Sequence, residues 1–356
     1  MKFDYCIGNP AYNLMSENTS DKPIYNDFMD ESYKIAKKVE LITPARFLFR
    51  AGKTPSAWNE KMLNDEHFKV LDYEPNSKNV FPDLAVPIKG GIAITYHDEK
   101  QNFGSIGTFT VHKELNTIAN KVKRHNDFET LDDSIVLQNR WNLDNLYEEH
   151  PELHVPYTNA KGEKVLPIGS GGKERRLTTS IFSLNKFCTT AVFKDEETEN
   201  SYKILGLINN TRHYKYTNKK YIDQTQDNLN KWKVILPKSN GTGILGETLS
   251  TPIVGEPSLG FTQSFISIGS FDNKQNAEAL LKYIKTKFTR ALLAVLKVTQ
   301  DNNKGTWKCV PTQDFTDNSD IDWSKSIHDI DQQLYRKYGL SEDEIEFIES
   351  HVKEMN

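Results

Sequence analysis

The first hundred residues of this 356-residue chain alternate short apolar runs with segments of helical periodicity. The periodicity predicts a helix near Ile24–Lys37 and another from Thr54-Pro55, where threonine would cap the helix and proline suits its first turn. The apolar runs predict strands at Tyr5–Gly8, Val39–Ile42, Lys69–Tyr73 and Gly91–Tyr96. Strands that alternate with helices form βαβ units in a mostly parallel sheet. A complete doubly wound domain needs two halves of this kind, and this pattern supplies only one.

From about residue 105 the pattern changes to short β-like segments separated by turns rich in Gly, Asn, Thr and Lys. These segments are Gly104–Thr110, Ser180–Phe193, Tyr202–Ile208, Lys233–Leu236 and Ser264–Gly269. Helices are predicted again at Asn276–Val298, at Ser326–Tyr338 before Gly339, and after a capping box from Ser341 to Glu344. We therefore predict an α/β fold. Residues 1–104 would form a partial doubly wound, Rossmann-like sheet, and residues 105–356 a mixed β-rich, α+β domain that ends in helices.

Composition narrows the class of protein. Apolar residues make up 37% of the chain and aromatic residues 11%, which is enough for packed cores. No run of 18 apolar residues occurs, and no basic start leads into a long apolar stretch, so neither a membrane span nor secretion is expected. The three cysteines are widely spaced, which suits reduced thiols in the cytoplasm and argues against a disulfide framework. With nine scattered histidines, we predict no metal site.

A turn-forming sequence, Gly8-Asn9-Pro10-Ala11-Tyr12, follows the first predicted strand. Proline favours a sharp turn at a strand end, because its φ is fixed and it has no N–H to satisfy. An ordinary Asn-Pro turn would explain these residues. However, Asn-Pro-x-Tyr at the C-terminal end of a buried strand also resembles the catalytic loop of amino-directed DNA methyltransferases, with Ala11 in place of the usual proline.

The resemblance implies a role for each residue of this loop. The side-chain amide oxygen of Asn9 and the carbonyl of Pro10 would accept hydrogen bonds from the exocyclic amine of the target base. They would thereby stabilise the positive charge that develops during methyl transfer. Tyr12 would stack on a base rotated out of the duplex, and Phe81 would form a second aromatic wall for that base.

Later segments carry the same resemblance. Leu41–Leu48 is similar to the family's Ile-Thr-Pro segment, and Val80–Asp83 with Ile88–Ile94 resembles a late motif before a strand hairpin. The C-terminal part, from Lys282 to Glu344, resembles the tail of the specificity region in single-chain restriction–modification enzymes. Together these segments resemble type II and IIG restriction–modification methyltransferases, which methylate adenine at N6 with S-adenosylmethionine as donor.

The resemblance also implies a glycine-rich donor site on the first strand–helix turn, ahead of the catalytic loop. Nothing comparable precedes Asn9, and we interpret the glycine cluster Gly169–Gly172 as a loop because no helix pattern follows it. Three explanations stay open: a second polypeptide supplies the first half of the domain, the chain is a fragment, or the chain no longer methylates.

Basic and aromatic residues interleave between Arg212 and Tyr221, in a stretch from Lys203 to Lys238 with eight basic and two acidic residues. This composition suits contact with phosphates and bases, although a solvated basic face on an edge hairpin would look the same. Given the resemblance, we predict that double-stranded DNA is contacted by Arg212, Tyr214, Lys215, Lys219 and Lys220, with Lys173, Arg175 and Arg176 as a second candidate group. The polar loop Lys238–Gly243 could contact DNA or form a plain turn.

DNA cleavage by this chain is not expected. A metal-dependent nuclease of the kind fused to relatives needs Pro-Asp and then an acidic residue two positions before a lysine on the next strand. Pro82-Asp83 is followed by Val86-Pro87-Ile88-Lys89, which lacks that acid. Two hypotheses remain. The chain is either a catalytic component of a site-specific adenine-N6 DNA methyltransferase, or a non-catalytic DNA target-recognition module whose sheet is a scaffold for a partner chain.

Overall fold

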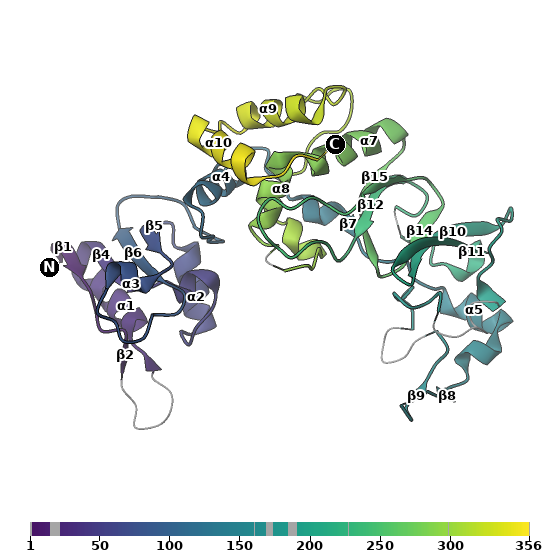
Figure 1. Cartoon of the computed structure of the whole chain (residues 1–356), viewed down its shortest axis with the longest axis horizontal. Helices are drawn as coiled ribbons and strands as arrows, with labels where there is room; N and C mark the ends of the chain where they lie inside the picture. The colour runs from purple at the N-terminus through teal and green to yellow at the C-terminus, as the bar shows by residue number, and fades with distance from the viewer. Residues whose placement is uncertain are drawn as a thin grey trace. The chain divides into compact units, whose positions relative to one another are not determined.

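The computed structural model describes residues 2–14, 22–159, 161–168, 174–183, 191–226, 228–297 and 299–355. These residues form two compact units, Met1–Asn120 and Lys121–Asn356 (Figure 1). Both units are mixed α/β structures with sheets of their own. No helix in the described part of the chain is long and apolar enough to cross a membrane.

The first unit contains a four-stranded sheet in the order β1-β4-β6-β5. Its strands are β1 (Phe3–Gly8), β4 (Ala36–Pro44), β5 (Phe68–Glu74) and β6 (Ile92–Asp98), all four of which the sequence predicts. β1 and β4 are parallel, whereas β6 is antiparallel to both β4 and β5. Three of the four strands, β1, β4 and β5, therefore run in the same direction, as the predicted mostly parallel sheet requires, and β6 alone runs opposite. The connection between β5 and β6 contains only the one-turn helix α3 (Ser77–Val80), and antiparallel neighbours need no long crossover helix.

One face of this sheet is covered by α1 (Tyr25–Ile35) and α2 (Ser56–Asn64). The predicted helices are confirmed, but Pro55 is the N-cap of α2 and no side chain caps that helix. The shared core is aromatic and aliphatic, and includes Met29, Val39, Leu41, Phe47, Trp58, Met62 and Phe68. A short 3-10 segment (Arg46–Phe49) follows β4, and a small antiparallel pair, β2 (Asn13–Leu14) with β3 (Lys22–Pro23), follows β1. These connections leave from the C-terminal ends of the parallel strands β1 and β4.

The second unit contains a three-stranded sheet and a four-stranded sheet. The first has the order β11-β10-β14, with β10 (Ser201–Ile208), β11 (Thr211–Asn218) and β14 (Leu259–Phe261). The second has the order β13-β12-β15-β7, with β7 (Ile135–Val136), β12 (Trp232–Pro237), β13 (Ile253–Gly255) and β15 (Phe265–Phe271). β10 and β11 form a hairpin whose turn, Asn209-Asn210, has two positive φ angles. Paired positive φ values fit the twist of adjacent antiparallel strands.

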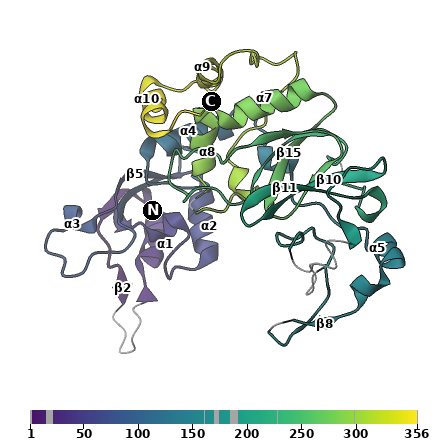
Figure 2. The same cartoon turned by 45° about the vertical axis from the view of Figure 1, so that its right-hand side comes forward.

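Helices complete the second unit. α7 (Lys274–Lys285), α8 (Lys287–Ala294), α9 (Ile327–Lys337) and α10 (Glu342–His351) lie together in both views (Figure 1, Figure 2). The predicted single helix Asn276–Val298 is wrong, because Thr286 ends α7 and caps α8 through its side chain. Gly339 has a φ of +59° after α9, and the capping box of Ser341 and Glu344 opens α10, as predicted.

One predicted strand is wrong. Gly104–Thr110 is irregular, and Gly104 and Gly107 have positive φ angles that extended ladders do not accommodate. Most of the predicted strand Ser180–Phe193 lies outside the described residues, since the structure describes only residues 180–183, which form a turn, and residues 191–193. The predicted strands at Tyr202–Ile208, Lys233–Leu236 and Ser264–Gly269 are confirmed.

Candidate functional site

The predicted catalytic loop follows β1 directly. Asn9 is exposed, while Pro10 and Tyr12 are half-buried. The Tyr12 carbonyl accepts the backbone N–H of Ile24 at 3.0 Å, which ties the loop to the start of α1. The Tyr12 ring packs against the core of the first unit. Its hydroxyl is buried with no hydrogen-bond partner among the described residues, and burial raises the pKa of Tyr12 to about 12.

Tyr12 lines a cavity of about 520 Å³, which we call the Tyr12 cavity. Its walls come from the loops after β1 and β4 and from the connection that leads to β6. The crevice at the carboxyl ends of strands is where ligands bind in open α/β sheets. Tyr12 and Tyr25 supply aromatic surface, and every charged residue of the lining is a cation, namely Arg46, Lys53 and Lys89. The cavity therefore suits a flat apolar group with a negative charge beside it.

Two segments singled out in the sequence meet beside this cavity. Ala45, after the Ile-Thr-Pro run, donates its N–H to the carbonyl of Gly91 at 3.0 Å. Gly90 has a φ of +89°, and a Cβ there would lie 2.3 Å from Cγ of Arg46. Gly91 has a φ of +77°, and a Cβ there would lie 2.4 Å from the carbonyl oxygen of Glu74. This glycine pair allows two backbones to approach and holds Arg46 at the cavity.

The remaining predicted residues of this site lie apart from the cavity lining. Asn9 is three positions from Tyr12, and its side chain is not part of the lining. Phe81 is half-buried at the end of α3. The cavity is lined instead by three other residues of the connection between β5 and β6, namely Val86, Pro87 and Ile88. Only Tyr12 of the predicted catalytic and base-binding residues contributes to the walls.

The first group of predicted DNA-contacting residues lies on β11, which carries Arg212, Tyr214 and Lys215, and on the 3-10 segment Lys219–Tyr221 that follows it. Arg212 bonds the carbonyl of Thr251 at 2.7 Å, and its guanidinium lies 5.6 Å from the centre of the Phe265 ring. The Tyr214 ring is exposed and lies 4.8 Å from Nζ of Lys203. Arg212 thus lies against the ring of Phe265, and one nitrogen of its guanidinium group is already engaged by a backbone carbonyl.

Lysines of the same group are also engaged. Lys215 forms an ion pair with Asp195, and Lys220 forms one with Glu149. Lys219 reaches the carbonyl of Glu199 at 3.4 Å. Exposed ion pairs contribute little to stability, but they lower the local net charge that the sequence alone suggests. The β11 hairpin is therefore much less positive in the fold than in the sequence.

A second cavity in the same unit, of about 700 Å³, has a stronger positive character. We call it the arginine cavity, because exposed Arg140, Arg175 and Arg176 line it together with Lys238. Glu174 is the one carboxylate in its lining. Backbone contacts bring the segment of Arg140 beside that of Arg175 and Arg176. Arg140 and Arg176 form an isolated antiparallel β-bridge, and the N–H of Trp141 donates to the carbonyl of Arg175 at 2.7 Å.

Stacked rings form another wall of the arginine cavity. The ring centres of Tyr147 and His154 lie 4.5 Å apart, and the planes of the two rings are inclined at 11°. Cations beside a stacked aromatic pair suit a nucleic-acid backbone with an adjacent base. Arg175 and Arg176 belong to the predicted second group, whereas Lys173 and the Gly169–Gly172 loop lie outside the described residues. No sequence pattern indicated Arg140, and Lys238 belongs to the polar loop for which two interpretations stayed open.

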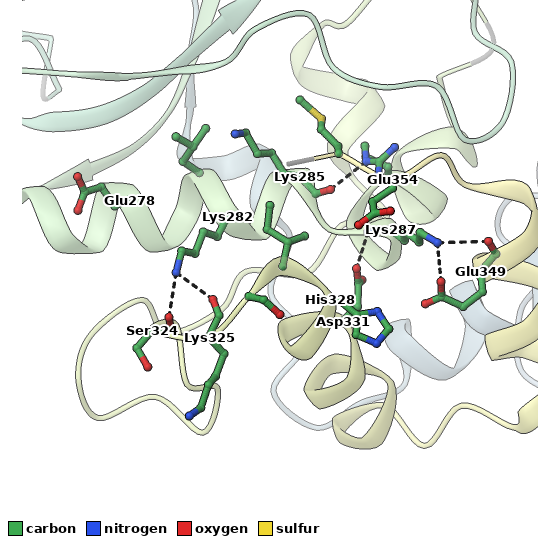
Figure 3. A pocket seen from close by; sticks show the side chains of 15 residues that line it. Glu278, Lys282, Lys285, Lys287, Ser324, Lys325, His328, Asp331, Glu349 and Glu354 are labelled. Atoms are coloured by element: carbon green, nitrogen blue, oxygen red, sulfur yellow. Dashed lines mark hydrogen bonds and ion pairs between the residues drawn. The ribbon is translucent and has the colours of Figure 1, made fainter.

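A third cavity, of about 1030 Å³, lies between the C-terminal helices (Figure 3). Its cations hold those helices together. Lys282 donates to the carbonyls of Trp323 at 2.8 Å and Lys325 at 2.9 Å, and Lys287 pairs with Glu349. Asp331 accepts the N–H groups at the start of α8, and burial raises its pKa to about 6. Because these charged side chains are engaged by backbone groups or by an opposite charge within the protein, we interpret the cavity as structural.

The described residues contain no group of His, Cys, Asp and Glu that could hold a metal ion. One pair, His150 and His154, has the His-x3-His spacing that suits zinc when it falls on a helix. Pro151 begins a 3-10 segment between them. His150 bonds the hydroxyl of Tyr221 at 3.1 Å, whereas His154 stacks on Tyr147. The two rings are thus engaged with different partners.

Comparison with known proteins identifies the first part of the chain. Residues 1–81 match the family model of the Eco57I restriction-modification methylase. This segment is of the restriction–modification methyltransferase type. A 97-residue stretch is also 33% identical to an uncharacterized adenine-specific methylase from Mycoplasma pneumoniae (strain ATCC 29342 / M129 / Subtype 1). That match covers 26% of this chain and 22% of the relative, so the chain spans about a fifth of that protein.

Among solved structures, the type IIG restriction endonuclease BpuSI aligns with 93% of this chain and 48% of its own, at a TM-score of 0.34 and 8% identity. A likeness of this size does not establish a shared fold. The methylase segment, residues 1–81, contains the Asn9–Tyr12 loop and the part of the Tyr12 cavity that Arg46 and Lys53 supply. Lys89 and the connection before β6 lie beyond it. The resemblance drawn from the loop and from the Ile-Thr-Pro segment is therefore confirmed where the family model applies.

Proposed function

We propose that this chain is a component of a site-specific adenine-N6 DNA methyltransferase in a restriction–modification system. The observation that carries the proposal is the position of the methylase segment's Asn-Pro-Ala-Tyr loop, which ends β1 and delivers Tyr12 to a cation-lined cavity. The substrate is an adenine of double-stranded DNA, rotated out of its helix. The methyl donor is S-adenosylmethionine, as in the family.

Each residue of the site has a task in this proposal. The flipped base enters the Tyr12 cavity, where the ring of Tyr12 stacks on it. Asn9 and the Pro10 carbonyl accept the two N–H bonds of the base amine, which brings that amine closer to tetrahedral geometry and stabilises its developing charge. Arg46, Lys53 and Lys89 neutralise the phosphates that flank the rotated nucleotide. Phe81 contributes a second aromatic contact when the loop and the connection close around the base.

Site-specific binding is assigned to the second unit. The arginine cavity offers Arg140, Arg175 and Arg176 to the phosphates, with the stacked Tyr147 and His154 beside them. The first predicted group would contribute to DNA contact only by exchanging its present partners, because each of its side chains is already engaged. This group consists of Arg212, Tyr214, Lys215, Lys219 and Lys220. Lys173 lies outside the described residues and is proposed to contact DNA on the resemblance alone.

The donor does not fit the described residues by themselves. The turn after β1 is Asn-Pro, and the pair Gly90-Gly91 packs against Arg46 and Glu74 rather than framing an open cradle. No step through the donor is therefore derived for this chain. We propose that a second polypeptide completes the methyltransferase domain and supplies the donor-binding half.

A second candidate function is a DNA target-recognition module without catalysis. Two observations favour it: Asn9 is exposed outside the cavity lining, and the arginine cavity is formed entirely within this chain. In that case the first unit acts as a scaffold for the partner, and Asn9 is an ordinary turn residue.

Methyl incorporation separates the two functions. The purified chain, alone and with the polypeptide encoded beside it, is incubated with duplex DNA and radiolabelled S-adenosylmethionine. We expect label in adenine N6 with the partner present, and a loss of at least about 100-fold in Asn9→Ala, in line with removal of one transition-state acceptor. Asn64→Ala, on the exposed side of α2, is the matched control and should retain activity. DNA binding without label under either condition would leave the recognition module as the function.

A further inference from the structure

The arginine cavity is concave, whereas a protein that reads the base edges of intact duplex DNA does so with a helix or ribbon that enters a groove. The cavity volume of about 700 Å³ lies within the range of pockets that enclose one small ligand. Its lining combines cations, an aromatic pair and two glutamines, all from the second unit. This lining suits one group of the size of a nucleotide better than it suits a paired helix.

The aromatic pair of the cavity forms a platform with one open face. Tyr147 lies on α5 (Leu143–Glu149; Figure 1) and packs against a hydrophobic core of the second unit. His154 ends the 3-10 segment after α5, and its buried neighbour Leu153 belongs to the same core. His154 stacks on Tyr147 with one face of its ring, yet it is exposed, so its other face is open to a further ring. Unpaired bases bind proteins by stacking on aromatic surfaces of this kind.

Two glutamine side chains in the lining lack partners. Gln138 is only 6% exposed and Gln263 is half-buried, and neither side-chain amide is hydrogen-bonded to another described residue. Their backbones are fixed, since the Gln138 carbonyl accepts Nε2 of Gln226 at 3.2 Å and the Gln263 N–H donates to Leu177 at 2.8 Å. A buried amide without a partner is unfavourable. An amide presents a donor and an acceptor side by side, which complements the edge of a base.

The arginines of the cavity can bind phosphates without giving up an ion pair. Unlike the lysines of the β11 group, Arg140, Arg175 and Arg176 form no ion pair in the part of the chain that the structure describes. The carboxylate of Asp223 is held mainly by the Thr225 hydroxyl, which donates to it at 2.7 Å. That hydrogen bond is the largest cause of the lowered pKa of Asp223, to which Arg140 and Arg175 add smaller contributions.

Resting on the assignment of this cavity to DNA in the proposed function, we infer that the arginine cavity takes up a single nucleotide that has left the duplex. The base of this nucleotide stacks on the open face of His154 and meets the amides of Gln138 and Gln263. The arginines neutralise the phosphates on either side of it. It is a different nucleotide from the target adenine, because the arginine cavity and the Tyr12 cavity share no lining residue.

The test compares two duplexes of the same sequence, one fully paired and one with a single unpaired adenine bulged from its middle. Fluorescence anisotropy measures the affinity of the full chain for each duplex. The bulged duplex should bind at least about tenfold more tightly, since its extra base needs no unpairing before it enters the cavity. His154→Ala should reduce this preference at least about fivefold, because it removes the stacking surface. It should leave the salt dependence of binding to the paired duplex unchanged, because the arginines remain.

His328→Ala is the matched control. His328 is exposed in the same unit and lies outside the arginine cavity, so this variant should keep the full preference for the bulged duplex. Gln138→Leu separates a binding role from a structural one. It replaces an amide that has no partner with an apolar group of similar size, so thermal melting should be unchanged or raised. The preference for the bulged duplex should fall at least about fivefold. A lower melting temperature with an unchanged preference would overturn the contact between Gln138 and the base.

The outcomes distinguish this inference from the proposed function. A preference for the bulged duplex that is lost in His154→Ala and kept in His328→Ala supports the nucleotide pocket, even where no methyl group is incorporated under any condition. Equal affinity for the two duplexes would overturn the pocket, even where the chain and its partner methylate DNA. A preference that persists in His154→Ala would overturn it as well, because easier bending of the bulged duplex would then explain the result.

Discussion

Replacing Arg140, Arg175 and Arg176 together with alanine should weaken DNA binding in a salt-dependent manner. The three guanidinium groups are exposed around one cavity, while the contacts that join their segments are made by the backbone. Alanine therefore removes charge without removing structure. Each cation that neutralises a phosphate adds about 0.9 to the slope of log affinity against log salt concentration.

The loss of three such contacts should reduce that slope by about 2.7. Between about 50 and 200 mM salt, the affinity of the unmodified chain should then fall about 40-fold more than that of the variant. Fluorescence anisotropy with a labelled duplex at several salt concentrations measures both slopes. Thermal melting of the variant should match that of the unmodified chain.

The matched control replaces Lys215, Lys219 and Lys220 with alanine. These lysines are engaged with Asp195, a backbone carbonyl and Glu149, so we expect the slope to change by less than about 0.5. The reasoning would be refuted by an unchanged slope in the arginine variant, or by an equal reduction in the lysine variant. The second result would place the DNA on β11, as the sequence suggests.

Three further predictions concern stability. Lys233 is buried and its Nζ bonds four backbone carbonyls, and burial lowers its pKa to about 7. Because the lysine of the unfolded chain stays protonated above that pH, the free energy of unfolding should rise by about 2 kcal/mol from pH 7 to 9 in urea titrations, and Lys233→Met should abolish this rise. An equal rise in both proteins would mean that the four carbonyls keep Lys233 charged and that another group causes the rise. The pKa of Asp331 is raised to about 6 by burial, so the folded state binds the extra proton and stability should fall by about 2 kcal/mol as the pH rises from about 4 to 6. Asp331→Asn should show no such fall in the same titrations, and a persistent fall would assign it to another group. Gly91→Ala should lower the free energy of unfolding by at least about 2 kcal/mol in urea titrations, because the new Cβ would clash with a backbone oxygen and the backbone has a positive φ. Gly162→Ala is the control: it has a similar φ and no neighbour within 4 Å, and should lower that free energy by only about 1 kcal/mol.

The sequence located local structure well because local structure is encoded locally. The four strands of the first unit, the helix-ending Gly339 and the capping box at Ser341 all follow from runs of neighbouring residues. The Asn-Pro-Ala-Tyr loop and the Ile-Thr-Pro segment also carried the family resemblance, which the match over residues 1–81 confirms. Short patterns of this kind depend on backbone geometry and chemistry within a few positions.

The ion-pair partner of each charged side chain could not be predicted from neighbouring residues in the sequence. Lys215 and Asp195 lie 20 positions apart, and Lys220 and Glu149 lie 71 positions apart. These two ion pairs lower the positive charge that the sequence of this stretch suggests. Arg140 and Arg176, by contrast, are unremarkable in sequence and form a positive cavity because a backbone bridge joins them. Charge counted along the sequence therefore does not show where positive charge gathers in the fold.

By itself, the sequence determined which segments of this protein become strands and helices, and that its first part is of the methylase type. Only the tertiary structure decided that β6 inserts antiparallel between β4 and β5, that Tyr12 and Arg46 share a cavity, and that β1 is left as an edge. The physical reason is that sheet order and side-chain proximity depend on contacts between residues far apart in the chain. Those contacts are chosen by the packing of the whole core and leave no periodic mark on the sequence.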